Sequence, residues 1–206
     1  MSNSVTWSEI QKALVLTNKI HPEFLESALI VGGGASLFYN LLLTKKADKA
    51  FPPISPSIGQ TNFSHDIDFT HVYFEDYRNV FKDFVKKDEK TGKEFIQIKG
   101  VRFGFLQFGC TFVPEEETEI AKKFKIDDNK FHINVLHPAS LYREKTYLIE
   151  KGRGKLNDEF HRSIAKQFCL MDYHQAAEEK KESLLSIYKD KAFEIFSEIT
   201  NNLSST

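Results

Sequence analysis

Three consecutive glycines between an apolar run and a helix-forming segment constrain the fold of this chain more than any other feature. Gly32, Gly33 and Gly34 follow the apolar residues 28–31 and precede residues 35–39, which favour a helix. Glycine lets a backbone approach a phosphate closely, and the amides at the start of a helix attract anions. The run matches neither a Walker loop nor a dinucleotide-binding fingerprint. Taken alone, it is better explained as a tight turn or a point of close packing.

The second informative feature is an Asp-x-Asp pair further along the chain. Asp66 and Asp68 alternate with apolar residues in the segment Ser-His-Asp-Ile-Asp-Phe, which predicts a strand over residues 66–70. Alternate positions of a strand share a face, so the two carboxylates can hold one divalent cation together. A solvated sheet edge, where acidic residues oppose aggregation, is the alternative. Ser64 is a candidate hydroxyl donor to phosphate, and no role is assigned to His65.

Together, these features resemble the opening motifs of the nucleotidyltransferase superfamily, most of all the small bacterial proteins related to the abortive-infection type IV toxins. In those proteins an apolar strand leads into Gly-Gly-x-Ala and a helix, and a variable loop precedes Ser/Thr-x-Asp-hydrophobic-Asp. Residues Val31–Ala35 and Ser64–Phe69 fill this pattern. A weaker match comprises an apolar strand, a proline, a helix with a lysine and a basic-acidic stretch, at Val135, Pro138, Lys145, Arg153, Lys155 and Asp158.

The resemblance implies an α+β (α/β) fold, in which a mixed β-sheet is flanked by helices and followed by a C-terminal helical extension. It implies a Mg²⁺- or Mn²⁺-dependent enzyme that moves a nucleoside monophosphate from a nucleoside triphosphate to a hydroxyl of a protein, an RNA or a small molecule. Asp66 and Asp68 would be the catalytic metal ligands. The nucleotide would be held by Gly32, Gly33, Gly34, Ser36, Ser64 and Lys145.

The chain departs from the superfamily at the third carboxylate, which a neighbouring strand usually supplies. The expected strand, residues 101–107, contains no acid, and Gly104 stands about where one is expected. Asn134 is a neutral substitute, while Glu94 and Asp127-Asp128 are acidic candidates that no spacing compels. Two carboxylates can still hold one Mg²⁺ whose other ligands are waters.

Three interpretations of function remain open at this stage. The first is a transferase that is slow or uses an unusual base. The second is a catalytically silent nucleotide-binding or interaction module on the same fold. The third, a phosphoesterase or kinase-like enzyme on another fold, would need a nucleophile or a Walker lysine that we do not find in the sequence.

Composition limits the remaining possibilities. A length of 206 residues favours one domain, with a core over 1–138 and a helical region over 139–206. A hydrophobic content of 41% with 19 Phe predicts an aromatic-rich core, and a net charge of -1 gives no global field for nucleic-acid binding. Neither a signal peptide nor a membrane-spanning run is evident, and Cys110 and Cys169 fit no metal spacing. We expect a cytoplasmic protein whose partners are a nucleoside triphosphate, an unidentified acceptor and a further protein, with a role related to toxin–antitoxin systems or phage defence.

Apolar periodicity and turn residues predict the elements of secondary structure. Helices are expected over 7–18, 22–27, 35–42, 73–87, 139–151, 157–173 and 175–201, with a further helix starting at 114. Strands are expected over 29–31, 66–70, 94–98, 101–108, 111–113 and 131–136. The proline-bearing segment 45–63 is expected to be a loop beside the site.

Overall fold

The computed structural model describes residues 7–45, 66–106, 121–126, 130–152, 158–159, 161–167 and 169. Two compact units divide the chain: residues 1–37 with 59–137, and residues 38–58 with 138–206. The first unit contains the glycine run and the aspartate pair, and the second contains Lys145. The domain boundary that we expect from the sequence stays a prediction.

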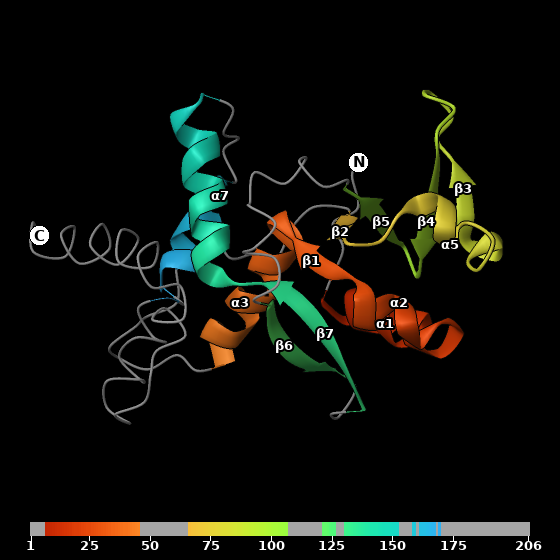
Figure 1. The fold of residues 1–206 in the computed structure, drawn as a ribbon, viewed down its shortest axis with the longest axis horizontal. Coiled ribbons are helices and arrows are strands. Elements are labelled where there is room, and N and C mark those ends of the chain that lie inside the picture. Colours follow the sequence, from red (N-terminus) through yellow and green to blue (C-terminus); the bar gives the residue numbers. More distant parts are fainter. Residues whose placement is uncertain are drawn as a thin grey trace, which may run out of the picture. The chain divides into compact units, whose positions relative to one another are not determined.

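A seven-stranded mixed sheet forms the centre of the first unit (Figure 1). Its strands, in spatial order, are β3 (Val85–Lys87), β4 (Glu94–Ile98), β5 (Val101–Phe105), β2 (Asp66–Thr70), β1 (Leu29–Val31), β7 (Phe131–Leu136) and β6 (Ala121–Ile126). Strand β2 runs antiparallel to β1 and parallel to β5. The strand with the aspartates is therefore a direct neighbour of the strand that leads into the glycines. The predicted mixed sheet with flanking helices is confirmed.

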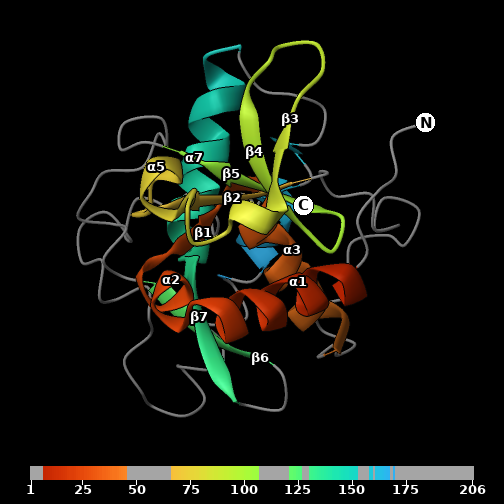
Figure 2. The same cartoon turned by 90° about the vertical axis from the view of Figure 1, so that its right-hand side faces the viewer.

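Two helices pack on the apolar face of this sheet, α1 (Trp7–Ile20) against β4 and β5, and α2 (Pro22–Ser27) against β7 (Figure 2). Pro22 suits the first turn of α2, where a backbone N–H has no helical partner. The fully buried Phe24 of α2 lies at the centre of an aromatic cluster. Its ring contacts Phe69, Tyr77, Phe81, Phe103 and Phe105, with ring centroids 4.8 to 6.2 Å apart.

Helix α3 (Gly32–Lys45) starts at the first glycine, three residues earlier than the sequence predicts. Glycine is a poor helix former, so another factor must favour it here. A Cβ on Gly34 would lie 3.1 Å from Cγ2 of Ile30 and 3.4 Å from Cγ2 of Ile67. The absent side chain thus lets the first turn of α3 pack directly on the apolar face of β1 and β2.

The single helix expected over residues 73–87 is wrong. The chain instead forms α5 (Phe74–Tyr77), the 3-10 helix η1 (Lys82–Phe84) and strand β3. The reason is a hairpin between β3 and β4, which Asp88 closes by accepting hydrogen bonds from the amides of Lys90 (3.0 Å) and Thr91 (2.8 Å). Gly92, with φ of 71°, returns the chain to β4. The helical spacing of Tyr77 and Phe81 reflects their shared contact with Phe24.

In the second unit, α7 (Pro138–Glu150) lies within one residue of its predicted bounds. Residues 158–159, 161–167 and 169 are helical, as expected for 157–173. Strand β6, at the edge of the sheet in the first unit, was not predicted from the sequence. The expected helix 175–201, strand 111–113, helix start at 114 and loop 45–63 lie outside the described residues. Within the described part of the chain, none of the helices has the length and apolar character to cross a bilayer.

Candidate active site around Asp66 and Asp68

Strand β2 presents its two carboxylates on one face and its apolar residues on the other. Ile67 and Phe69 are fully buried, whereas Asp66 and Asp68 are half-buried. In the antiparallel register with β1, Asp68 stands opposite Val31, the residue directly before the glycine run. The fold therefore places the aspartate pair next to the glycine turn, although the two motifs are well separated in the sequence.

The carboxylate of Asp68 lies between two glycines from the neighbouring elements. A Cβ on Gly32 would lie 3.8 Å from Oδ2 of Asp68. On the other side, Gly104 of β5 stands opposite Asp68 in the parallel register, and a Cβ there would collide with Oδ1 and lie 3.3 Å from Cγ. Neither neighbouring position carries a side chain, and the Asp68 carboxylate occupies the space that a side chain at position 104 would need.

Each residue of the glycine run has a different environment. Gly32 adopts φ of 57°, a left-handed conformation that glycine tolerates best, so it forms the turn from β1 into α3. Gly34 permits the close packing of α3, and Gly33 is half-buried. Ser36, another candidate nucleotide contact, is fully buried within the unit. Ser64 lies outside the described residues.

The acidic or neutral substitutes for a third carboxylate are engaged elsewhere or lie outside the described residues. Glu94 accepts two hydrogen bonds from Arg78, at 2.6 Å to Nε and 3.0 Å to Nη2. Glu94 also points away from the aspartates. It lies two residues before Ile96 on β4 and so shares the face of Ile96, which pairs with the buried Phe103 on the side of the sheet opposite the aspartates. Asn134 donates from Nδ2 to the backbone oxygen of Glu26 at 2.8 Å, which ties β7 to α2. Residues 127–128 lie outside the described part of the chain.

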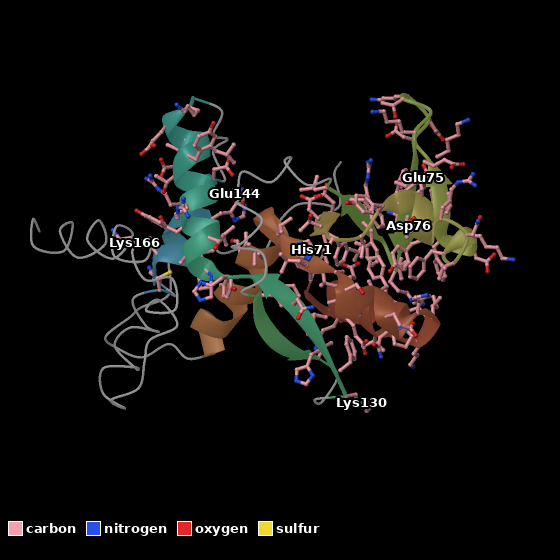
Figure 3. All side chains as sticks on the ribbon, viewed as in Figure 1. His71, Glu75, Asp76, Lys130, Glu144 and Lys166 are labelled. Carbon is pink, nitrogen blue, oxygen red and sulfur yellow. The ribbon has the colours of Figure 1, made fainter. Side chains whose placement is uncertain are left out.

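Further acids follow the C-terminal end of β2 without forming a metal-binding group with the pair. His71, with φ of 68°, directly follows the strand, and Glu75 and Asp76 lie in the first turn of α5 (Figure 3). Within the described ranges, no three residues among His, Cys, Asp and Glu lie close enough together to bind one metal ion. The candidate metal site of the described structure thus consists of Asp66 and Asp68.

Lys145, the remaining predicted nucleotide contact, forms a buried ion pair in the second unit. Its Nζ lies 3.0 Å from Oδ1 of Asp158, and the two side chains are only 8% and 11% exposed. Burial, followed by the charge of Lys145, lowers the pKa of His161 to about 4, although Asp158 acts in the opposite direction. The contact of Lys145 with a phosphate stays a prediction; its charge already has a carboxylate partner.

One residue of the aspartate face was missed by the sequence analysis. Arg102 of β5 stands opposite Asp66 in the parallel register, and both are half-buried. Its Cζ lies 4.4 Å from the centroid of the Phe95 ring on β4. The signal was available in the sequence, because Arg102 precedes Gly104 by two residues and alternate strand residues share a face.

A separate hollow of about 540 Å³ runs along α1 in the first unit. Three lysines, Lys12, Lys19 and Lys99, line it together with Val15 and Leu16. Neither aspartate is among its lining residues. The candidate site is therefore not part of this hollow. It is defined by the register of β1, β2 and β5.

Comparison with known proteins supports the fold. No protein-family model matches the chain, and no curated protein matches it. The structure of an antigenic nucleotidyltransferase-like protein from Paracoccidioides brasiliensis matches with a TM-score of 0.57 at 13% identity, over 98% of this chain and 94% of that one. This chain has a nucleotidyltransferase-like fold. The polyadenylate synthase of Megavirus gives a TM-score of 0.40 at 14% identity, over 86% of this chain and 38% of that one.

Proposed function

We propose that this protein is a nucleotidyltransferase that moves a nucleoside monophosphate from a nucleoside triphosphate to a hydroxyl acceptor. The observation that carries the proposal is the alignment of Val31 with Asp68. It brings the amides at the start of α3 and the aspartate pair to one place, in a fold that is nucleotidyltransferase-like. The amides at the start of a helix attract phosphate oxygens, and carboxylates bind a divalent metal ion. The site therefore offers ligands for both the triphosphate and the metal ion of a metal–nucleotide complex.

Asp66 and Asp68 fit a single Mg²⁺ or Mn²⁺ ion. Their carboxylates share one half-buried face of β2, and oxygen is the ligand that these cations prefer. Mg²⁺ commonly keeps several waters, so two protein carboxylates are a sufficient anchor. When bound, the ion would polarise the phosphoryl group and neutralise the charge that develops on the phosphate oxygens during displacement at the α-phosphorus. The chain's own contribution is to fix both carboxylates on a strand and to leave the positions beside Asp68 free of side chains.

A second candidate function is a catalytically silent nucleotide-binding module. It is favoured by Gly104, which occupies the position opposite Asp68 on β5, where the resemblance leads us to expect a third carboxylate. Without that acid, the described residues offer no evident base for the acceptor hydroxyl. The toxin or phage-defence role, the bacterial origin and the cytoplasmic location stay predictions from the sequence.

The test is label transfer from each of the four α-³²P nucleoside triphosphates with Mg²⁺ or Mn²⁺. The acceptors supplied are the protein itself, total RNA and a mixture of small hydroxyl compounds. We expect transfer by the natural protein and a loss of at least about 100-fold in the Asp66→Asn/Asp68→Asn variant, as is typical when a stabilising charge is removed from a transfer site. Asp76→Asn is the matched control, because Asp76 is an acid of the same unit on α5.

Binding of Mn²⁺, measured by electron paramagnetic resonance, separates the two candidates. Nucleotide-dependent Mn²⁺ binding that needs both aspartates, without any transfer, would identify the silent module. Neither transfer nor metal binding above that of the double variant would reject both candidates. An equal loss of transfer in Asp76→Asn would show that the effect comes from the change in net charge and not from Asp66 and Asp68 specifically.

A further inference from the structure

We propose that Arg102 binds a phosphate group on the aspartate face of the sheet, and that Phe95 holds its guanidinium in place. The inference deepens the proposed function, because it adds an anion-recognising residue to the same face as Asp66 and Asp68. Three observations carry it: the register of β5, the stacking of Arg102 on Phe95, and the donors that this arrangement leaves available.

The register places Arg102 and Gly104 on the same face as the two aspartates. Arg102 pairs with Asp66, and Gly104 pairs with Asp68. On the other side of β5, Gln97 of β4 pairs with Arg102. One step further along this antiparallel register, Phe95 comes opposite Gly104. In the register of the sheet, Gly104 therefore stands between Asp68 of β2 and Phe95 of β4.

The contact with Phe95 orients the Arg102 side chain along its own face. The guanidinium carbon lies 4.4 Å from the ring centroid, within the range of a cation–π interaction. Because Phe95 stands opposite Gly104 and not opposite Arg102, this contact runs diagonally between β4 and β5, as long side chains on one face of a sheet commonly do. Neighbouring strands are about 4.8 Å apart, so β4 with Phe95 lies about 10 Å from β2 with the aspartates, and Arg102 of β5 stands between them.

The described residues accept no hydrogen bond from Arg102. Among the residues that the structure describes, its guanidinium has no hydrogen-bond or salt-bridge partner; it stacks on the Phe95 ring, and its charge helps to lower the pKa of Asp88. By contrast, Arg78 uses two donors on Glu94. A planar guanidinium with free donors matches the oxygens of phosphate in a bidentate way, and ring stacking keeps it ordered.

Two sources of this phosphate are compatible with the arrangement, the nucleotide itself or a phosphorylated acceptor. The chemistry is the same in both cases, and the two are distinguished by competition. A phosphate of the nucleotide is displaced by inorganic tripolyphosphate, whereas an acceptor phosphate binds beside it.

The experiment is calorimetric titration of the full chain with inorganic phosphate in the presence of EDTA. We expect Arg102→Gln to weaken binding about 10- to 100-fold, the usual effect of losing hydrogen bonds to a charged group. Arg102→Lys keeps the charge but lacks the two parallel donors of the guanidinium, so its phosphate affinity should stay below that of the natural protein. Phe95→Leu should weaken phosphate binding about 2- to 5-fold. Arg78→Gln removes the same charge from the same unit and should leave binding unchanged. Thermal unfolding of each variant checks that it folds.

The source is then identified by repeating the phosphate titration with the protein saturated by tripolyphosphate and Mg²⁺. Phosphate binding that persists and still requires Arg102 assigns the site to an acceptor. Mutual displacement, with tripolyphosphate also weakened by Arg102→Gln, assigns it to the nucleotide.

Phosphate and tripolyphosphate affinities within about 2-fold of the natural protein in folded Arg102→Gln would overturn the proposal, and so would an equal loss in Arg78→Gln. Because the EDTA titration needs neither metal nor turnover, this failure is distinct from a failure of the proposed transferase activity.

Discussion

The carboxylate of Asp68 lies over the backbone of Gly104, in the space that a side chain at position 104 would occupy. A Cβ at that position would collide with Oδ1 and lie 3.3 Å from Cγ and 3.7 Å from Cα of Asp68. The absence of a carboxylate at position 104 and the position of the Asp68 carboxylate are therefore linked. An acidic residue at 104 would require Asp68 to adopt another rotamer, so glycine here is part of how Asp68 is placed.

We expect Gly104→Ala to weaken Mn²⁺ binding about 10-fold, because the new methyl group turns the Asp68 carboxylate away from its present position. The free energy of unfolding should change by less than about 1 kcal/mol, since the displaced atom is the end of a flexible side chain and glycine is itself unfavourable within a strand. Electron paramagnetic resonance measures the metal affinity, and urea unfolding measures the stability.

A double-mutant cycle tests whether Gly104 acts through Asp68. In the Asp68→Ala background, Gly104→Ala should have no further effect on Mn²⁺ affinity, because the group that it displaces is absent. A 10-fold loss that persists in that background would mean that Gly104 acts through another residue.

Gly32 should tolerate asparagine better than valine. Its φ of 57° is a left-handed conformation that asparagine adopts with modest strain and β-branched residues avoid. We expect Gly32→Asn to reduce the free energy of unfolding by about 1 kcal/mol and Gly32→Val by about 2 kcal/mol or more. Urea unfolding of both variants decides the matter, and equal losses would argue against backbone strain as the cause.

The elements around the site could be predicted from the sequence because local signals define them. Strands β1, β2, β4 and β7 and helix α2 have the bounds that apolar patterning and turn residues predict. The nucleotidyltransferase-like fold was also predictable, because two short motifs carry the resemblance. Their closeness in space was not visible locally; it results from the pairing of β1 with β2.

The secondary structure was predicted wrongly where a tertiary contact outweighs the local spacing of apolar residues. Tyr77 and Phe81 have helical spacing, but the residues after them extend into β3 because the turn at Asp88 pairs them with β4. Arg102 was missed for a related reason: its spacing from Gly104 indicates that the two share a face, but its position beside Asp66 depends on the register of β5 with β2. The pairing of Lys145 with Asp158 was likewise not predicted, because only the tertiary structure brings these two residues together.

The buried Lys145–Asp158 pair should be sensitive to removal of one partner. Lys145→Ala leaves the carboxylate of Asp158 buried without its cation, which typically costs about 3–5 kcal/mol. Lys145→Met/Asp158→Leu should recover most of this stability, because replacing both charges with apolar groups of similar size removes the unpaired charge. Urea unfolding of the single and double variants measures the difference. A single variant within about 1 kcal/mol of the natural protein would contradict a buried ion pair.

Stability should also depend on the protonation of His161. Burial and the charge of Lys145 lower its pKa from 6.5 to about 4, so the unfolded chain binds a proton that the folded chain excludes between these values. The contribution of neutral His161 is therefore present above about pH 6.5 and is lost as the pH falls toward 4. Between pH 7 and pH 5 we expect the free energy of unfolding to fall by about 2 kcal/mol on this account.

His161→Gln, which cannot titrate, isolates this contribution from that of other groups. Urea unfolding of both proteins is measured at steps from pH 7 to pH 5. We expect the unfolding free energy of the natural protein to fall by about 2 kcal/mol relative to that of the variant over this range. Most carboxylates titrate below this window, so their effect is small and common to both proteins. A difference that stays constant across the window would mean that His161 titrates alike in the folded and unfolded chain, and that its burial beside Lys145 does not exclude the proton.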